Sequence, residues 1–290
     1  MFGEIFAFSD HSLVNFVGGG GKTALIHRLL DEYSSRGPVL ATTTTRVHPP
    51  DPQEGLALIS SDNLALLKFT IENIARDCAK LPFKIIASRY FMSSNLVRGV
   101  PPDFFKNIDR SLFPIFLNEA DGAASFSLKL PRESEPVPAV GAEYLVPVIG
   151  LDCIGRKLGA DTVLRWLELS ESFSLCKGDL ITPEIAARIL MHPRGVCKNP
   201  RPGTTIIPFI NKVDSEEQDQ TALELAAAIL NNGAFPIERV IYGSVFNNRA
   251  ACLSLAVADS LLAAERNCLP GAHGYTADRF ERNMKEAITP

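Results

Sequence analysis

The sequence predicts an α/β protein in which a mostly parallel β-sheet is flanked by helices. Short apolar runs typical of buried strands alternate with longer segments of helical spacing through most of the 290 residues. Such alternation favours parallel strands joined by helices that cover both faces of the sheet. Polar or glycine-rich segments follow several of the apolar runs, and ligands of such sheets bind at the carboxyl ends of the strands.

The first half of the chain contains four predicted strands, which occupy residues 13–17, 38–42, 84–88 and 113–118. Helices are predicted between them at residues 22–33, 61–80 and 101–110. A Gly-Pro pair ends the first helix, Ser61 or Asp62 is expected to cap the second, and a proline opens the third.

The second half begins with residues 127–143, which are rich in proline and charge and are predicted to form a loop. Strands follow at 144–149, 205–210 and 239–242, and helices at 162–169, 183–191, 221–230 and 253–264. We expect a single domain over residues 1–270, with room for a smaller insert at about 123–203, and a polar tail at 271–290.

Composition and charge argue against several classes of protein. Hydrophobic residues make up 46% and charged residues 21% of the chain, as in ordinary globular proteins. A net charge of -4 argues against nucleic acid as a partner, because phosphate backbones need a basic footprint. No apolar stretch predicts a membrane span and no signal peptide is visible, so we expect a cytoplasmic protein. None of the six cysteines forms a C-x-x-C pair, which favours reduced thiols over a metal site.

A glycine-rich motif predicts a phosphate-binding loop and comprises Gly18, Gly19, Gly20, Gly21, Lys22 and Thr23. Backbone N–H groups of a P-loop surround phosphate oxygens, its lysine contacts the β- and γ-phosphates, and its threonine ligates Mg²⁺. The complete pattern has a glycine where this chain has Phe16. The motif nevertheless lies between a predicted strand and a predicted helix, and it therefore predicts a P-loop NTPase-like fold that binds ATP or GTP.

Two acidic residues, Glu119 and Asp121, follow the predicted strand at 113–118. P-loop proteins hold Mg²⁺ or its waters with an acid at this point. Residues two apart on an extended chain share a face, so both acids are expected to reach the metal together with Thr23. We expect Lys22, Glu119 and Asp121 to carry catalysis. An Asp-Gly surface turn without function is the alternative interpretation.

The segment Asn211-Lys212-Val213-Asp214 matches the guanine-reading Asn-Lys-x-Asp pattern of GTPases. Asp214 would accept hydrogen bonds from the guanine ring N–H and amino group, which adenine does not offer. The aliphatic stem of Lys212 would cover the ring and Asn211 would brace the loops. The pattern favours GTP over ATP, and a solvated turn is the alternative.

Four threonines at residues 42–45 precede Arg46. The run is typical of a strand end and equally of a switch segment whose hydroxyls contact Mg²⁺ or the γ-phosphate. The sequence does not choose among the four, and Arg46 is a candidate for an arginine that stabilises the transition state. By contrast, His48, His192 and the charged run at 132–136 are more typical of structural or solvated positions than of a site.

As an ordered set, these motifs resemble those of YqeC-type proteins, which are described as accessory proteins of selenium-dependent molybdenum hydroxylases. The resemblance covers roughly residues 12–260 and rests on residues 17–23, 41–45, 119–122, 135–138, 192–195 and 211–214. Around residues 164–166 the chain has Leu-Arg-Trp where a His-Arg pair is expected, which leaves the helix there without an expected role. The resemblance implies a fold like that of the GTPases that assemble the urease and hydrogenase metal centres, with Glu119 near the nucleotide.

The leading hypothesis from the sequence is a nucleoside triphosphatase with Mg²⁺ that helps to mature a client molybdenum hydroxylase or its cofactor. Two alternatives remain open. One is a nucleotide-gated module that delivers a cofactor without significant turnover, and the other is a kinase acting on a small molecule.

Overall fold

The computed structural model describes residues 1–48, 55–89, 91–92 and 96–255. It confirms an α/β fold with a large, mostly parallel sheet. The sheet consists of β1 (Ser12–Gly18), β2 (Val39–Thr43), β4 (Leu56–Ser60), β5 (Lys84–Ser88), β8 (Ile115–Glu119), β10 (Tyr144–Gly150), β12 (Thr205–Ile206), β13 (Phe209–Asn211), β14 (Arg239–Ser244) and β15 (Arg249–Ser254). Their order is β15-β14-β13-β10-β1-β8-β2-β5-β4, with β12 beside β10, and only β14 and β15 pair antiparallel.

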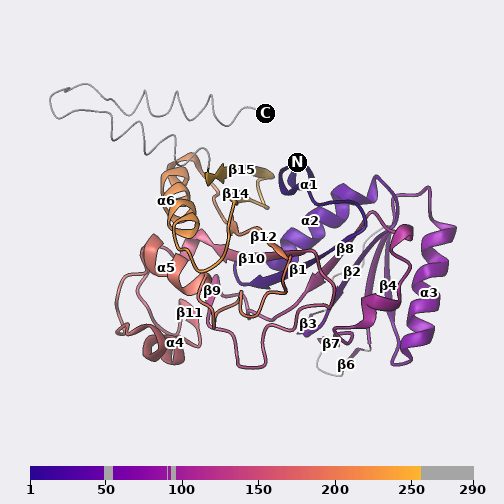
Figure 1. Ribbon diagram of the computed structural model, residues 1–290, viewed down its shortest axis with the longest axis horizontal. Coiled ribbons are helices and arrows are strands. Elements are labelled where there is room, and N and C mark those ends of the chain that lie inside the picture. The colour runs from indigo at the N-terminus through magenta and orange to yellow at the C-terminus, as the bar shows by residue number, and fades with distance from the viewer. Residues whose placement is uncertain (49–54, 90, 93–95, 256–290) are drawn as a thin grey trace.

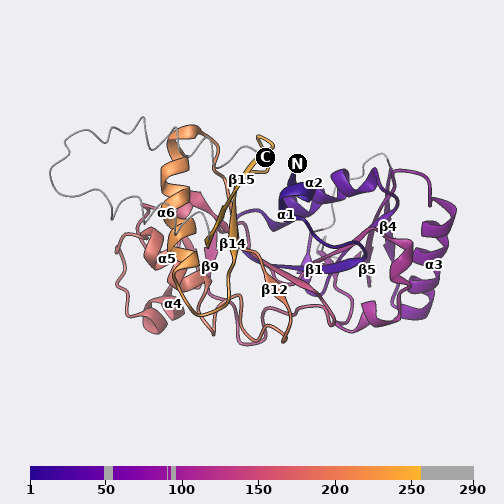
Figure 2. The ribbon, with the colours of Figure 1, turned by 45° about the horizontal axis from the view of Figure 1, so that its top comes forward.

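The α-helices that flank the sheet are α1 (Phe2–Phe6), α2 (Lys22–Ser34), α3 (Leu64–Asp77), α4 (Trp166–Phe173), α5 (Pro183–Leu190) and α6 (Asp219–Leu230). Two smaller sheets stand apart from the main one. One contains β3 (Arg46–Val47), β6 (Phe91–Met92) and β7 (Leu96–Arg98), and the other pairs β9 (Leu128–Lys129) with β11 (Val163–Leu164). In Figures 1 and 2, α4, α5 and α6 gather at one end of the molecule and α3 lies at the other.

Both faces of the sheet are covered, as the alternation of strand side chains requires. Val14 and Phe16 of β1 pack in the core that α1 and α2 build on one face. Leu13 and Val17 point to the opposite face, where the core has two parts. Leu13 belongs to the part under α3 and Val17 to the part under α5 and α6.

A polar contact occupies the space between these two parts of the core. The buried side chain of Asn15 donates to Ala139 O (3.2 Å) and accepts from Ala139 N (2.9 Å). Asn118 Nδ2 donates to the same Asn15 oxygen at 2.8 Å. The amide of Asn15 therefore pairs with the backbone of residues 135–142 as a neighbouring strand would, and it fixes this loop across the carboxyl ends of β1 and β8.

Several predicted elements needed correction in the first half of the chain. Residues 101–110 do not form one helix but two 3-10 turns, η1 (Phe104–Asn107) and η2 (Arg110–Leu112). The cap of α3 is Asn63, which accepts from Leu66 N at 3.0 Å, and not Ser61 or Asp62.

The second half shows further differences. The predicted helix at 162–169 is split into β11 and α4, because Arg165 has a left-handed backbone with φ of 62°. Pro208 lacks an N–H group and separates β12 from β13 within the predicted strand at 205–210. Residues 253–254, predicted as helical, belong to β15, and residues 256–264 of that predicted helix and the tail at 271–290 lie outside the described residues.

Within the described parts of the chain, no helix has the length and apolar character needed to cross a membrane.

Glu72 of α3 provides a test of the packing at the edge of the sheet. Its carboxylate accepts from Lys68 Nζ (2.7 Å) and Asp109 N (2.9 Å). Burial acts to raise the pKa of Glu72, but these hydrogen bonds outweigh burial and the pKa is lowered from 4.5. We expect Glu72→Gln to reduce the free energy of unfolding by about 1–2 kcal/mol at neutral pH.

Because the pKa is lowered in the folded state, this contribution exists above the unfolded pKa and is lost as pH falls through the folded pKa. Urea unfolding at pH 7 and at about pH 3 measures the difference. Glu171→Gln, at an exposed position of α4, is the matched control and should change neither value. A deficit of equal size at both pH values would contradict the charge-dependent role of Glu72.

Candidate functional site

The glycine loop lies where ligands of parallel sheets bind. It leaves the carboxyl end of β1, which has β8 on one side and β10 on the other. After β1 the chain forms β2 on the far side of β8 and later forms β8 itself beside β1. It then crosses to the other side of β1 to form β10. The strand order therefore reverses direction at β1, directly beside the loop.

Glycine is required in this loop by both conformation and space. Gly18, Gly20 and Gly21 have φ values of 93°, 76° and 116°. A Cβ atom at Gly18 would lie 2.3 Å from Val148 O, and one at Gly20 would lie 2.1 Å from Gly150 N. No other residue fits these positions without moving the end of β10.

Three N–H groups of the loop already donate to protein acceptors. Gly18 N donates to the Asp121 carboxylate (3.0 and 3.1 Å), Gly19 N to Val148 O (2.9 Å) and Gly20 N to Phe126 O (2.9 Å). The start of α2 differs, because its cap is Gly21 and no side chain caps it. The loop thus offers the first turn of α2 to a phosphate, rather than the full circle of N–H groups that the motif predicted.

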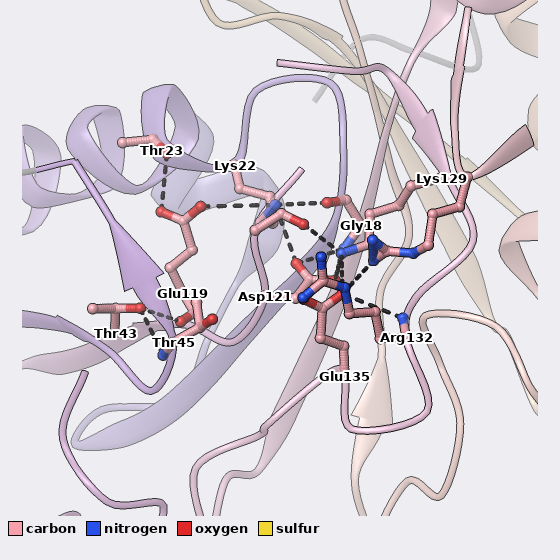
Figure 3. Close-up of polar contacts among 12 residues, drawn as sticks. Gly18, Lys22, Thr23, Thr43, Thr45, Glu119, Asp121, Lys129, Arg132 and Glu135 are labelled. Atoms are coloured by element: carbon pink, nitrogen blue, oxygen red, sulfur yellow. Dashed lines mark hydrogen bonds and ion pairs between the residues drawn. The ribbon is translucent and has the colours of Figure 1, made fainter. Parts of the chain in front are cut away.

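Lys22 is buried, with 3% of its surface exposed, and its ammonium group faces the protein. Its Nζ donates to Gly18 O at 2.6 Å and lies 3.1 Å from Asp121 Oδ1 and 3.7 Å from Glu119 Oε1. Figure 3 shows the lysine between these two carboxylates. These two carboxylates therefore balance the positive charge of Lys22.

Glu119 faces Thr23 at the start of α2. Thr23 Oγ1 donates to Glu119 Oε2 at 2.9 Å, and burial raises the pKa of Glu119 against the opposing effect of Lys22. Hydroxyl and carboxylate oxygens are ligands that suit Mg²⁺. Within the described residues, no group of three or more His, Cys, Asp or Glu side chains is placed to hold a metal ion.

Asp121 lies in a different environment from Glu119. It is fully buried, and beside its contacts with Gly18 N and Lys22 its Oδ2 lies 2.8 Å from Lys129 Nζ. Both oxygens are thus engaged by protein cations or N–H groups. The geometry favours Glu119 over Asp121 as a metal ligand.

Three charged residues at this site were not predicted. Lys129 of β9 is buried, donates to Gly122 O at 2.5 Å and lies 3.3 Å from Glu135 Oε2. Arg165 Nη2 donates to the same Glu135 oxygen at 2.6 Å. The interpretation of residues 132–136 as a solvated run is therefore wrong for Glu135. Positive and negative groups alternate along this ion-pair chain, which consists of Lys22, Asp121, Lys129, Glu135 and Arg165. Figure 3 labels the first four of these residues.

Asn211 connects the glycine loop to the far end of the sheet. Its Nδ2 donates to Gly20 O at 2.8 Å, and its Oδ1 accepts from Val245 N at 3.1 Å. Asn211 itself is buried. The contact holds the segments after β1, β13 and β14 together at one edge of the sheet.

Lys212 and Asp214 lie beside this contact. Lys212 Nζ donates to Ser127 Oγ (2.8 Å) and Asp152 Oδ2 (2.9 Å). Asp214 is exposed, and its Oδ1 accepts from Ser244 Oγ at 2.6 Å. The serine hydroxyl therefore orients a carboxylate that solvent can reach.

The threonine run serves the fold at three of its four positions. Thr42 Oγ1 donates to Ala87 O (2.6 Å), Thr43 Oγ1 donates to Glu119 O (2.9 Å), and Thr44 Oγ1 donates to Val137 O. Thr45 lines a neighbouring cleft, to which Thr44 also contributes. The first three hydroxyls thus join β2 to the segments beside it.

Comparison with known proteins agrees with the motifs. A family model described as YqeC protein matches residues 14–167, more than half of the chain. The chain belongs to the YqeC family. It is 26% identical over 223 residues to the uncharacterized protein YqeC of Escherichia coli strain K12, covering 74% of this chain and 81% of that protein. No solved structure matches the chain.

The YqeC match covers the glycine loop, both acidic residues and the whole ion-pair chain up to Arg165. It ends before Asn211, so the segment at residues 211–214 lies outside it.

Lys129 tests whether the ion-pair chain holds the site together. Lys129→Met leaves the buried Asp121 with one cation fewer, and we expect a loss of about 3–5 kcal/mol in the free energy of unfolding. Adding Asp121→Asn should recover a large part of that loss, because the unbalanced charge is removed. Urea unfolding measures each variant. Lys157→Met removes an exposed charge and should cost less than about 0.5 kcal/mol, and an equally small effect of Lys129→Met would refute the role of the chain.

Proposed function

We propose that this YqeC-family protein binds a nucleoside triphosphate with Mg²⁺ and hydrolyses it slowly, with GTP preferred over ATP. The observation that carries the proposal is the contact of Asn211 with Gly20 O, which joins the base-reading segment to the glycine loop across 191 residues of sequence. We further propose that this activity supports maturation of a selenium-dependent molybdenum hydroxylase, as the family resemblance implies.

The central strands support a P-loop NTPase-like interpretation of the fold. The strand that carries the glycine loop, β1, pairs with β8, and Phe16 of β1 is level with Glu119 at the end of β8. A phosphate bound at the start of α2 would therefore lie next to the acid. Helix N-termini bind anions because their N–H groups are unpaired and their dipole is positive.

Lys22 would exchange partners when a triphosphate binds. Its ammonium now faces Gly18 O and two carboxylates, and it would turn to the β- and γ-phosphates. The Thr23 hydroxyl and the Glu119 carboxylate would hold Mg²⁺, which neutralises charge on the phosphates. Asp121, which contacts Gly18 N and Lys129, would keep the glycine loop in position.

Hydrolysis would be slow because catalysis here rests on positioning and local charge alone. Among the described residues, Glu119 forms an ion pair with Lys22 and with no arginine. A partner that supplies an arginine would accelerate the reaction.

The five cysteines of the described residues are free thiols, which suits the cytoplasm, where we place the protein.

A small-molecule kinase is the second candidate function. The observation that favours it is an arginine-rich cleft that meets the ion-pair chain at Glu135 and Arg165. A kinase would transfer labelled phosphate from the nucleotide to an added metabolite, whereas a triphosphatase would release it to water.

The phosphate-binding role is tested with Lys22→Ala and Thr23→Ala. We expect both variants to bind the Mg²⁺ complex of GTP at least about tenfold more weakly than the wild type, measured by calorimetry, and to release less phosphate. Circular dichroism must show both variants folded, because Lys22 balances buried acids. Lys157→Ala is the matched control. Failure of wild-type protein to bind either nucleotide with Mg²⁺ would rule out the proposal.

Base choice is tested with Asp214→Asn. An amide at this position still accepts from Ser244 Oγ but no longer pairs with the two N–H donors of guanine as a charged acceptor. We expect GTP binding to weaken about 10- to 100-fold and ATP binding to change less than twofold. Competition between the two nucleotides measures the ratio. Equal loss of both would remove the base-reading role and leave the phosphate-binding role standing.

A further inference from the structure

A second cleft opens beside the acidic turn, on the side away from Lys22. Its volume is about 900 Å³. It is bounded by the threonine run, the small β3-β7-β6 sheet and the loop at 132–137. Its wall contains a single carboxylate, Glu135, and five arginines, which are Arg46, Arg89, Arg98, Arg132 and Arg165.

We propose that this arginine cleft binds a phosphorylated small molecule with an apolar organic body. The chain as a whole carries a net charge of -4, so five arginines in one cleft are a local concentration of positive charge. Arginine suits phosphate because its planar guanidinium donates two parallel hydrogen bonds to the oxygens.

The pairing of the small sheet brings like charges together. Arg46 of β3 is directly opposite Arg98 of β7 in the antiparallel register. Arg89 N donates to Arg98 O at 2.8 Å, so a third arginine lies next to this pair. Like charges directly opposite each other destabilise a strand pair, and an anion bound between them removes that repulsion.

The described residues neutralise little of this charge. Glu135 is already bonded to Arg165 and Lys129. Across the described residues, no carboxylate lies within ion-pair distance of Arg46, Arg98 or Arg132. Arg89 is 3.6 Å from Asp62 through Nη2, while its buried Nε has no hydrogen-bond partner there. Donor capacity is thus left for a ligand.

The same cleft offers apolar surface for the rest of the ligand. Val100, Pro101, Pro102, Val137 and Leu164 form part of its wall. A pocket that combines convergent charged donors, apolar wall and this volume is typical of small-molecule sites. An inorganic phosphate ion would leave that apolar surface exposed to water, which is why we infer an organic phosphate.

The cleft does not include the glycine loop, but a series of ion pairs connects the two. Glu135 lines the cleft and contacts Lys129, which pairs with Asp121, which in turn contacts Lys22. Ligand binding in the cleft does not require a nucleotide at Lys22. The two proposals can therefore fail independently.

Phenyl phosphate and inorganic phosphate are the probes, titrated by calorimetry without Mg²⁺ at low salt. We expect phenyl phosphate to bind the wild type several-fold more tightly than inorganic phosphate does. The double variant Arg46→Ala/Arg98→Ala should bind both at least about tenfold more weakly, while Lys22→Ala should stay within about twofold of wild type. Arg156→Ala/Arg201→Ala removes two exposed arginines elsewhere and is the matched control.

Thermal unfolding supplies a second measurement that does not depend on heats of binding. Phenyl phosphate should raise the unfolding temperature of wild type and of the control, and not that of Arg46→Ala/Arg98→Ala. Without ligand, the arginine variant should be at least as stable as wild type, because a repulsive pair is removed. Absence of saturable binding up to about 10 mM, equal affinity for the two probes, or loss of binding in Lys22→Ala instead would each overturn the proposal.

Discussion

The site depends on the carboxylate of Asp121, which is fully buried between two ammonium groups. Its oxygens accept from Gly18 N and lie 3.1 Å from Lys22 Nζ and 2.8 Å from Lys129 Nζ. A buried carboxylate without such partners would cost several kcal/mol, so the groups around it cannot move independently. The glycine loop, the acidic turn and β9 are therefore held as one unit, although they come from distant parts of the sequence.

Two lysines contact the carboxylate of Asp121, so one of them could turn away without leaving that carboxylate unpaired. A triphosphate at the start of α2 would draw Lys22 away from Asp121, which alone would leave a buried charge unpaired. Lys129 stays in place, because it also bonds Gly122 O and Glu135. In the proposed function one lysine would serve the ligand while the other balances the acid, so phosphate binding would not disrupt the core beside it.

The sequence predicted those parts of the fold and site that local patterns encode. The strand, glycine loop and helix around Lys22 follow from an apolar run, a motif and helical spacing, and the structure places β1 and α2 within two residues of the prediction. Lys129 and Glu135 were missed because they lie in a segment without periodicity. They are held by long-range contacts, because Lys129 of β9 pairs with β11 and Glu135 pairs with Arg165. The left-handed backbone of Arg165 likewise has no local signal.

The balance of charge distinguishes the two anion sites that we propose. Around the glycine loop, counting each group as ionised, three cations face three carboxylates, and these are Lys22, Lys129 and Arg165 against Glu119, Asp121 and Glu135. A triphosphate added to this neutral set needs further positive charge, which the α2 N-terminus supplies in part and Mg²⁺ must complete. The described residues that line the arginine cleft instead include five arginines and one carboxylate. An anion there offsets part of this excess of positive charge, so binding in the cleft does not need a metal.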